Sequence, residues 1–250
     1  MNFHTTGVFF SPTGGTKHAL ECFLNLFDPN ADRLDVTCSP SHAKQVDFGP
    51  TDVLVLAFPV YAGQIPAVPE LFCNLHGKET PCVLLACYGN RHYDDALAQL
   101  SFRLHKQGFI CIGAAACITP HIFALSLGKD HPAESDKKVL QNLAQSVWKK
   151  LDVADHTPVV LPGEKLPPHK DAKPVPKSRD EKLCTYCKSC VRSCPAQAID
   201  EQLQVDESKC IHCMHCVSIC PVGALSYDAS ALQARLTQNF SARREVELFL

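Results

Sequence analysis

The chain has no long uninterrupted hydrophobic run. Its longest apolar stretch, residues 53–62, is broken by Pro59 and is far shorter than the roughly 20 apolar residues that a membrane-spanning helix needs. The first residues show neither a cationic start nor a cleavage signal, so we expect no secretory peptide. These absences predict a cytoplasmic protein without a membrane span.

Excess positive charge is also missing. The 24 lysines and arginines are outnumbered by 26 acidic residues, and the formal net charge is −2. No basic cluster is large enough to indicate a nucleic-acid partner. Neither the G-x4-G-K-[S/T] pattern nor the G-x-G-x-x-G pattern occurs, so a nucleoside triphosphatase or a dinucleotide-binding fold has little support.

Cysteine, in contrast, is abundant, with 15 residues. Disulfide bonds are uncommon in a reducing cytosol. Eight of the cysteines fall within residues 184–220 in a regular pattern, which favours metal binding. The other cysteines show no ligand spacing and are expected to be small core residues. These are Cys22, Cys38, Cys73, Cys82, Cys87, Cys111 and Cys117.

The eight patterned cysteines form an internal repeat. Residues 184–195 read CTYCKSCVRSCP, and residues 210–221 read CIHCMHCVSICP. Each half is the C-x2-C-x2-C-x3-C-P run that binds iron–sulfur clusters in bacterial ferredoxins. The alternative is a pair of zinc sites, but structural zinc usually joins two separated C-x2-C knuckles. Because no cysteine is replaced by aspartate, the pattern favours [4Fe–4S] clusters over three-iron clusters.

The repeat resembles the dicluster ferredoxin family over about 45 residues. The resemblance implies one-electron transfer, with the fourth cysteine of each run binding the other cluster. One cluster would be bound by Cys184, Cys187, Cys190 and Cys220, and the second by Cys210, Cys213, Cys216 and Cys194. The side chains of His212, Met214 and His215 lie between ligands and are expected to face solvent.

Residues 1–152 alternate apolar and amphipathic runs. Continuous apolar runs are typical of strands buried on both faces of a parallel sheet, and they occur at 7–10, 53–58, 82–87 and 110–118, with a weaker one at 33–37. Helical spacing predicts helices at 20–27, 94–107 and 134–151. The pattern predicts an α/β fold with a doubly wound, five-stranded parallel sheet.

The composition changes after this first domain. Residues 153–182 are rich in proline, which predicts a semi-rigid linker. Residues 183–228 carry the repeat and predict a small α+β dicluster ferredoxin domain, and residues 229–250 predict a C-terminal helix and tail. We expect the linker to wrap one domain around the other and to place a cluster near Tyr61 and Tyr88.

A hydroxyl-rich turn follows the first predicted strand. Residues 11–16 read SPTGGT and precede a predicted helix. Glycines let backbone N–H groups approach an anion, hydroxyls donate hydrogen bonds, and the helix dipole favours negative charge. The candidate phosphate-binding residues are Ser11, Thr13, Gly14, Gly15 and Thr16.

This turn resembles the phosphate loop of flavodoxins, which bind flavin mononucleotide (FMN). Residues 59–66 and 88–95 follow the third and fourth strands, where flavodoxins have the loops that clasp the flavin ring. The resemblance implies FMN contacts at Val60, Tyr61, Ala62, Gly63, Tyr88, Gly89, Tyr93 and Asp94. One of the three tyrosines is expected to stack on the ring. The second loop has no tryptophan, so the alternative is a flavodoxin-like scaffold without a cofactor.

The whole chain resembles the flavodoxin–ferredoxin fusion family. This implies an electron-transfer protein that passes electrons between two [4Fe–4S] clusters and FMN. Two alternatives stay open: a ferredoxin-fed flavin reductase acting on a small molecule, with Arg91, His92 or Tyr93 as proton donor, and a redox sensor with a flavin-free scaffold. Each cluster adds a charge of about −2, which predicts a redox partner protein with a basic docking patch.

Overall fold

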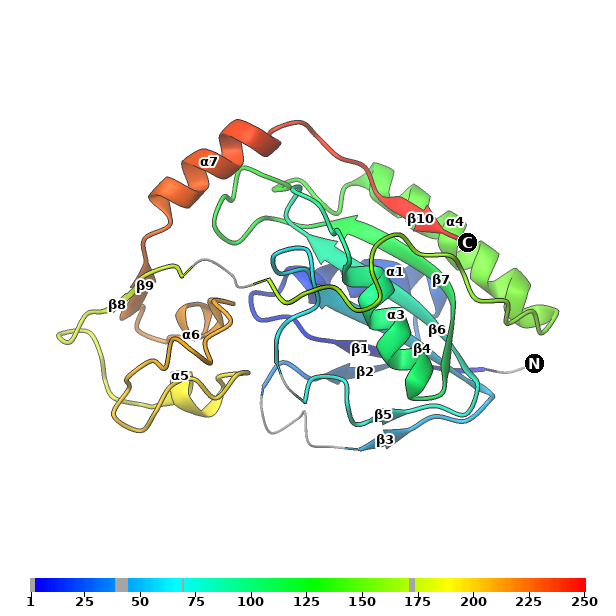
Figure 1. Ribbon diagram of the computed structural model, residues 1–250, viewed down its shortest axis with the longest axis horizontal. Helices are drawn as coiled ribbons and strands as arrows, with labels where there is room; N and C mark the ends of the chain where they lie inside the picture. Colours follow the sequence, from blue (N-terminus) through cyan, green and yellow to red (C-terminus); the bar gives the residue numbers. More distant parts are fainter. Residues whose placement is uncertain (1–2, 39–44, 69, 171–173) are drawn as a thin grey trace.

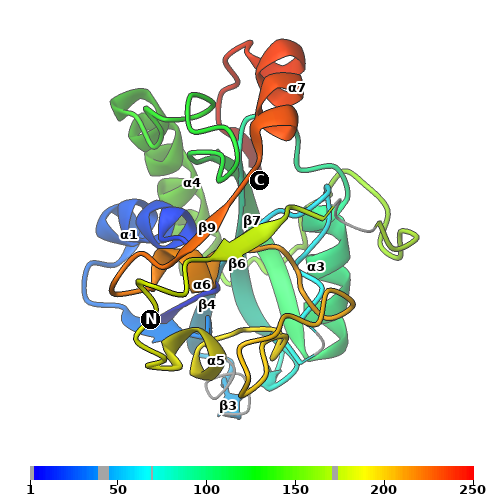
Figure 2. The same cartoon turned by 90° about the vertical axis from the view of Figure 1, so that its left-hand side faces the viewer.

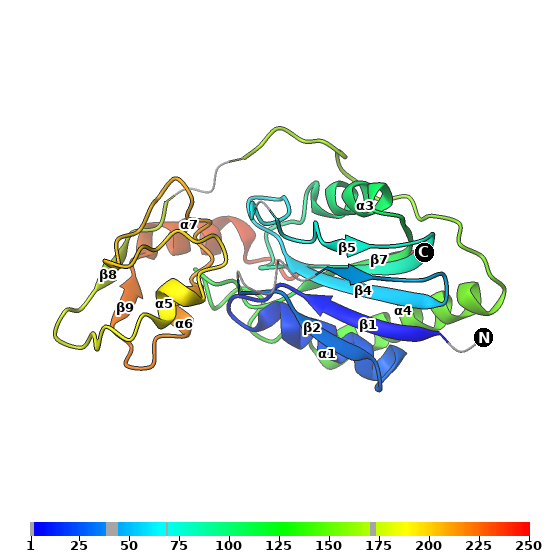
Figure 3. The ribbon, with the colours of Figure 1, turned by 90° about the horizontal axis from the view of Figure 1, so that it is seen from below.

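The computed structural model describes residues 3–38, 45–68, 70–170 and 174–250. Within these ranges the chain forms an α/β domain and a smaller C-terminal module. The module lies beyond one end of the central sheet of the α/β domain (Figures 1 and 3). The ends of the strands, rather than a face of the sheet, are therefore directed toward the module.

The central sheet has six strands in the order β10-β7-β6-β4-β1-β2. The strands are β1 (His4–Phe9), β2 (Asp32–Asp35), β4 (Asp52–Pro59), β6 (Thr80–Tyr88), β7 (Phe109–Ile118) and β10 (Glu247–Phe249). The five predicted strands are present and pair in parallel, whereas β10 runs antiparallel to β7. The prediction missed β10 because this short strand comes from the C-terminal tail, far from its partner in sequence.

Helices cover both faces of the sheet, as expected for apolar parallel strands. Figure 2 shows α1 (Gly15–Phe27) and α4 (Glu134–Asp152) on one face and α3 (Ala96–Lys106) on the other. α1 buries the apolar stripe that its sequence predicted, which consists of Leu20, Phe23, Leu24 and Phe27. Two short strands, β3 (Val46–Asp47) and β5 (Leu75–His76), pair outside the sheet.

The strand order creates a switch point beside β1. β1 lies between β2 and β4, so the chain winds outward from it in both directions. The loops that follow β1 and β4 therefore separate at the carboxyl edge of the sheet and leave a crevice, which is where open α/β sheets bind ligands. The C-terminal module lies at this edge (Figure 3).

The C-terminal module is built on a two-stranded antiparallel sheet. β8 (Lys177–Arg179) pairs with β9 (Leu225–Tyr227). Between them run the two cysteine loops, which lead into the short helices α5 (Ser189–Arg192) and α6 (His215–Ser218). β8 falls within the range 153–182 that the sequence predicted as a linker.

The proline-rich connector lies against the α/β domain. The backbone N–H of Val159 donates a hydrogen bond to the Cys111 carbonyl oxygen at 2.9 Å. The side-chain amide of Gln64 donates to the Pro168 carbonyl at 2.7 Å and accepts from the Lys170 N–H at 3.2 Å. Over its described residues the connector is therefore fixed to the α/β domain at both Cys111 and Gln64.

The C-terminal segment returns from the module to the sheet. α7 (Ser230–Phe240) follows β9 and leads to β10 (Figure 1). The Asn90 side chain donates hydrogen bonds to the carbonyls of Phe240 and Ala242 at 2.7 and 2.8 Å, and the Tyr93 hydroxyl donates to Glu247 at 2.6 Å. These contacts fix α7 between the two domains.

The cysteines outside the repeat differ in burial. Cys82, Cys87, Cys111 and Cys117 are buried in the sheet, as predicted, in the register pairs 82–111 and 87–117. Cys73 is exposed, so the core prediction is wrong there, and Cys22 and Cys38 are half-buried. No helix in the described ranges is both long and apolar enough to cross a membrane.

Candidate functional site

The cysteines of the repeat gather around two cavities in the C-terminal module. One cavity is lined by Cys184, Cys187, Cys190 and Cys220, which we call the outer site. The other is lined by Cys194, Cys210, Cys213 and Cys216, which we call the inner site. Cys216 also touches the outer cavity. Each site thus collects three cysteines of one run and the fourth cysteine of the other.

The backbone repeats its conformation in both cysteine loops. Tyr186 and Lys188 have positive φ angles of 53° and 58°, and the equivalent His212 and Met214 have φ angles of 51° and 57°. Such left-handed turns direct successive backbone N–H groups toward one centre, where they stabilise negative charge. The N–H groups of Ala198 and Ala224 donate to the sulfurs of Cys194 and Cys220 at 3.3 and 3.2 Å.

Residues 176–228 match the family model of the 4Fe-4S dicluster domain. This part of the chain is a 4Fe-4S dicluster domain. The match implies two [4Fe–4S] clusters and suggests electron transfer. No curated protein and no solved structure shows a significant similarity to the chain.

The two sites of the dicluster domain hold their thiols in different surroundings. At the inner site, burial raises the pKa of Cys213 to about 12 and the pKa of Cys216 to about 11, and neighbouring cysteines add to both shifts. At the outer site, burial also raises the pKa of Cys190, but hydrogen bonds from Ser189 lower the pKa of Cys187. Thiolates at the inner site therefore depend more strongly on the positive charge of bound iron.

Backbone hydrogen bonds stabilise the thiolate of Cys220. Partial burial raises the pKa of this thiol, but four backbone N–H groups together outweigh that effect and lower it. The N–H groups belong to Val222, Gly223, Ala224 and Leu225. Backbone hydrogen bonds to ligand sulfurs are one of the means by which a protein tunes a cluster's reduction potential.

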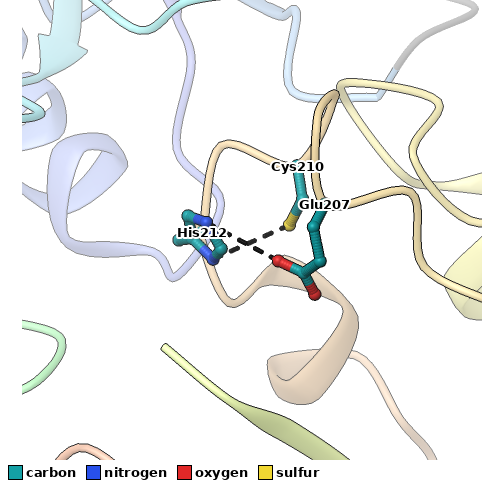
Figure 4. A group of neighbouring side chains, drawn as sticks. All are labelled: Glu207, Cys210 and His212. Atoms are coloured by element: carbon teal, nitrogen blue, oxygen red, sulfur yellow. Dashed lines mark hydrogen bonds and ion pairs between the residues drawn. The ribbon is translucent and has the colours of Figure 1, made fainter. Parts of the chain in front are cut away.

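Glu207, Cys210 and His212 form a small group beside the inner site (Figure 4). Their potential ligand atoms all lie within 4.8 Å of one another. Cys210 also lines the inner cavity with three other cysteines, so the group offers no separate metal site when Cys210 binds a cluster. His212 instead contacts Lys177, whose ammonium group lies 3.3 Å from His212 Nδ1.

Three loop side chains at the inner site are buried. Met214 is 3%, His212 6% and His215 8% exposed. The prediction that they face solvent is wrong, because the inner loop packs against the α/β domain. Tyr186, the equivalent of His212 in the outer loop, is 57% exposed. The two repeats thus differ in environment although their ligand spacing is the same.

The inner loop contacts the hydroxyl-rich turn directly. His215 Nδ1 donates a hydrogen bond to the carbonyl oxygen of Pro12 at 2.7 Å, and the Ser218 hydroxyl donates to the same oxygen at 3.1 Å. His215 Nε2 also lies 3.8 Å from the sulfur of Cys38. These contacts dock the inner site on the loop that follows β1.

Apolar side chains extend this docking contact. Met214 packs in a cluster with Ile122 and Phe123, which follow β7 in the α/β domain. The Tyr227 hydroxyl donates a hydrogen bond to the Ile122 carbonyl at 2.7 Å. The dicluster domain is therefore held by both polar and apolar contacts at the carboxyl edge of the sheet.

A cavity of about 410 Å³ lies at this junction. Its size is within the range of roughly 300–1,000 Å³ that is usual for small-molecule sites. The predicted loops contribute Ser11, Thr13, Gly15, Thr16, Val60, Tyr61, Ala62 and Gly89. Arg91, one of the residues considered as a proton donor, also lines the cavity. The structure thus brings the three predicted loops to a single cavity.

Other predicted contact residues do not line the cavity. Gly14 adopts a left-handed conformation, φ 89°, just before α1. Gly63 packs against Asp94 so closely that a Cβ atom at position 63 would lie 2.0 Å from the Asp94 carboxylate. Tyr88 and Tyr93 are 2% and 3% exposed and pack edge to face. These residues support the conformation of the loops without lining the cavity.

Tyr61 is the predicted aromatic residue that does line the cavity. Burial raises the pKa of its hydroxyl well above the usual value, and the nearby Cys213 thiol raises it further. Tyr61 therefore lies between the cavity and a cysteine of the inner site. Of the two tyrosines expected near a cluster, Tyr61 thus lies close to a cysteine of the repeat, whereas Tyr88 lies in the core.

The sequence did not predict a further wall of the cavity. It consists of residues 119–123 after β7, Lys170 of the connector, Ile211 and His212 of the inner loop, and Leu232, Arg235 and Leu236 of α7. No motif marks these residues, because they come from four segments far apart in sequence.

Hydrogen bonds hold the hydroxyl-rich turn in place at the start of α1. The Ser11 hydroxyl accepts a hydrogen bond from the Lys17 N–H at 2.9 Å, and the Ser11 N–H donates to the Thr37 hydroxyl at 2.9 Å. α1 begins at Gly15, so its first N–H groups are directed toward the cavity side of the turn. Thr13 and Thr16 line the cavity at the same end.

Proposed function

We propose that the protein transfers electrons between its two clusters and an FMN bound in the cavity at the domain junction. The observation that carries this proposal is the composition of the cavity wall. The hydroxyl-rich turn forms one side, and Ile211 and His212 of the inner cysteine loop form another. A molecule bound there would touch both domains.

The residues present fit FMN in charge and in shape. The turn at residues 11–16 offers hydroxyls, backbone N–H groups and a helix N-terminus to a phosphate. The parallel strands follow the order β2-β1-β4-β6-β7, which is the flavodoxin-like order with its ligand site at the switch point. These features support a flavodoxin-like domain and FMN as its ligand.

We assign the cluster ligands to the two cysteine sites. Cys184, Cys187, Cys190 and Cys220 would bind the outer cluster, and Cys194, Cys210, Cys213 and Cys216 the inner cluster. The grouping of these thiols around separate cavities supports the crossed ligand set. Since Cys213 lies close to Tyr61, the inner cluster would be the one nearer the cavity.

The protein's own contribution is to hold the two redox sites together. His215 and Ser218 anchor the inner loop on Pro12, and Met214 packs against the loop after β7. A bound flavin supplies the link between one-electron and two-electron chemistry. Electrons entering at the exposed outer site would pass through the inner site to the cavity, or in the reverse direction.

A flavin reductase acting on a small molecule is the second candidate. The cavity is walled by α7 and by the dicluster domain, so it is more enclosed than a loop surface alone would be. Of the three proton donors considered, only Arg91 lines it. The Tyr93 hydroxyl is bonded to Glu247, and the His92 ring stacks on Tyr93.

The external partner would be a redox protein with a basic docking patch. The chain carries a formal charge of −2, and two clusters would bring it to about −6. Long-range attraction between opposite charges speeds association and weakens as salt is added. The exchange rate with a cationic redox protein should therefore fall as ionic strength rises.

The test is anaerobic reconstitution followed by a rate measurement. Iron, sulfide and FMN are quantified on the purified chain, where we expect about eight irons and one FMN. The clusters are then reduced rapidly, and flavin absorbance is followed at several protein concentrations. A rate independent of concentration is expected, because both sites lie in one molecule.

Two results would contradict the proposal. A reconstituted chain with both clusters that binds no FMN would leave the domain as a flavin-free scaffold. A flavin reduction rate proportional to protein concentration would mean that electrons travel between molecules. In that case the contact between the inner site and the cavity would have no role in electron transfer.

A further inference from the structure

His121 belongs to the part of the cavity wall that the sequence did not predict. It lies on the loop after β7, next to Ile122 and Phe123, which pack in a cluster with Met214 of the inner loop. The position is on neither of the ring-clasping loops nor on the phosphate-binding turn. Its surroundings nevertheless fix the orientation of its imidazole ring.

Two neighbours hold the ring in place. The backbone N–H of Phe123 donates a hydrogen bond to His121 Nδ1 at 3.1 Å. The Cβ, Cγ and Cδ2 atoms pack on Gly89, where an added Cβ would lie within 2.5–2.6 Å of them. Gly89 lies on the third predicted loop and itself lines the cavity. What remains for the cavity is the Nε2 and Cε1 edge.

The chemistry of Nε2 follows from the bond at Nδ1. A neutral imidazole has one donor and one acceptor nitrogen, so an Nδ1 that accepts a hydrogen bond leaves the proton on Nε2. Nε2 has no hydrogen-bond partner among the described residues. It is also not one of the buried side-chain atoms of these residues that lack a partner, so it is accessible. An N–H donor is therefore exposed to the cavity.

The charge state of His121 supports this picture. Burial lowers the pKa of the imidazole to about 4, so the ring is neutral at physiological pH. A fixed neutral donor suits an uncharged acceptor such as a carbonyl oxygen or a ring nitrogen. The phosphate end of the cavity, in contrast, is formed by the turn at residues 11–16.

We propose that the Nε2–H of His121 donates a hydrogen bond to the ring portion of the flavin, which makes His121 a flavin-binding residue on a fourth loop. This inference rests on the proposed function, since it takes FMN as the occupant. The ring portion is favoured because His121 packs on Gly89, which belongs to a loop predicted to clasp the ring.

Two substitutions separate the donor from the structural role of the side chain. In His121→Asn, the amide oxygen takes the place of Nδ1 and can accept from the Phe123 N–H, but no donor reaches the position of Nε2. In His121→Gln, the longer side chain carries its NH₂ group to that position. His105→Asn, at the exposed end of α3, is the control.

The measurement is the dissociation constant of FMN and of riboflavin for the cluster-loaded protein, from flavin fluorescence quenching. Loss of one neutral hydrogen bond should weaken binding about three- to tenfold in His121→Asn. His121→Gln should stay within about twofold of wild type, and so should the control. Riboflavin has the same ring and lacks only the phosphate. Its affinity should therefore fall by the same factor as the affinity of FMN.

Each contrary result has a distinct meaning. Unchanged flavin affinity in His121→Asn would overturn the inference, as would an equal loss in both variants together with a lowered melting temperature. A loss seen with FMN but not with riboflavin would move the contact to the phosphate and overturn the ring assignment. A wild-type protein that binds neither flavin would instead refute the proposed function.

Discussion

The two halves of the dicluster domain share one sequence pattern and differ in what surrounds them. The outer loop exposes Tyr186 by 57%, and Leu183 beside it by 51%. The equivalent inner loop buries His212 and Met214 against the α/β domain. Ligand spacing and backbone turns are the same in both loops. The difference therefore arises from docking and not from the way each loop holds its cysteines.

This comparison indicates a division of roles. An exposed site can meet an external redox protein, whereas a buried site meets only what the fold places beside it. Here the fold places Tyr61 and the cavity beside the inner site. The same cysteine spacing thus gives two cysteine sites with different neighbours, one toward solvent and one toward the cavity.

The largest effect should come from removing a fourth cysteine. If the ligands are crossed, Cys194→Ala should abolish the inner cluster or convert it to a three-iron cluster. Cys220→Ala should have the same effect on the outer cluster. Electron paramagnetic resonance of the two reduced variants should show loss of different signals, with flavin reduction impaired in both. If each variant instead lost the cluster adjacent in sequence, the crossed assignment would be wrong.

The next effect should come from exchanging equivalent residues of the two loops. Met214 is 3% exposed, so Met214→Lys would bury an ammonium group at the docking contact and destabilise the docked state by at least about 2 kcal/mol. The matched exchange Lys188→Met, on the exposed outer loop, should change stability by no more than about 0.5 kcal/mol. Anaerobic urea unfolding, followed by cluster absorbance, measures both variants.

These two exchanges test the docking comparison directly. Met214→Lys should also make the flavin reduction rate depend on protein concentration, because undocked domains react between molecules. Equal stability of the two variants would show that the inner loop gains nothing from its contact with Ile122 and Phe123. The distinction between an inner and an outer site would then lose its structural basis.

A third effect, confined to flavin affinity, should come from the turn at residues 11–16, which contacts the inner loop and is proposed to bind the FMN phosphate. Thr13→Val removes one hydroxyl donor from the cavity wall but leaves Pro12, which anchors His215, unchanged. Hydrogen bonds to charged groups contribute about 1.5–3 kcal/mol, so FMN affinity should fall about ten- to a hundredfold. Fluorescence titration checks this.

A second measurement on Thr13→Val sharpens the interpretation. Iron content should equal that of wild type, and riboflavin affinity should change by less than about twofold, since riboflavin carries no phosphate. A comparable loss of riboflavin affinity would mean that Thr13 supports the shape of the cavity rather than the phosphate. Loss of iron would show that the turn and the inner cluster cannot be altered separately.

Much of the α/β domain follows from local sequence patterns. The continuous apolar runs predict the five parallel strands because strands buried on both faces need no polar alternation. The helix stripe at Leu20, Phe23, Leu24 and Phe27 likewise predicts α1. Local patterns did not indicate β10, since a strand of three residues has too little periodicity to be recognised and depends on β7 for its hydrogen bonds.

The burial of loop side chains was the clearest limit of sequence reasoning. His212, Met214 and His215 were expected to face solvent because they are loop residues between cysteine ligands. Their burial depends on a second surface, formed by Pro12, Ile122 and Phe123. No local rule relates these positions, because they lie about 90 to 200 residues apart.

The sequence by itself determined the cysteine pattern, the order of the strands' apolar runs and the hydroxyl-rich turn at residues 11–16. These are short-range features, fixed by ligand spacing, side-chain burial and backbone turns within a few residues. Only the tertiary structure decided which cysteine site faces the cavity, and that α7 and His121 line it. Those outcomes depend on the packing of distant segments, whose contact energies no local pattern encodes.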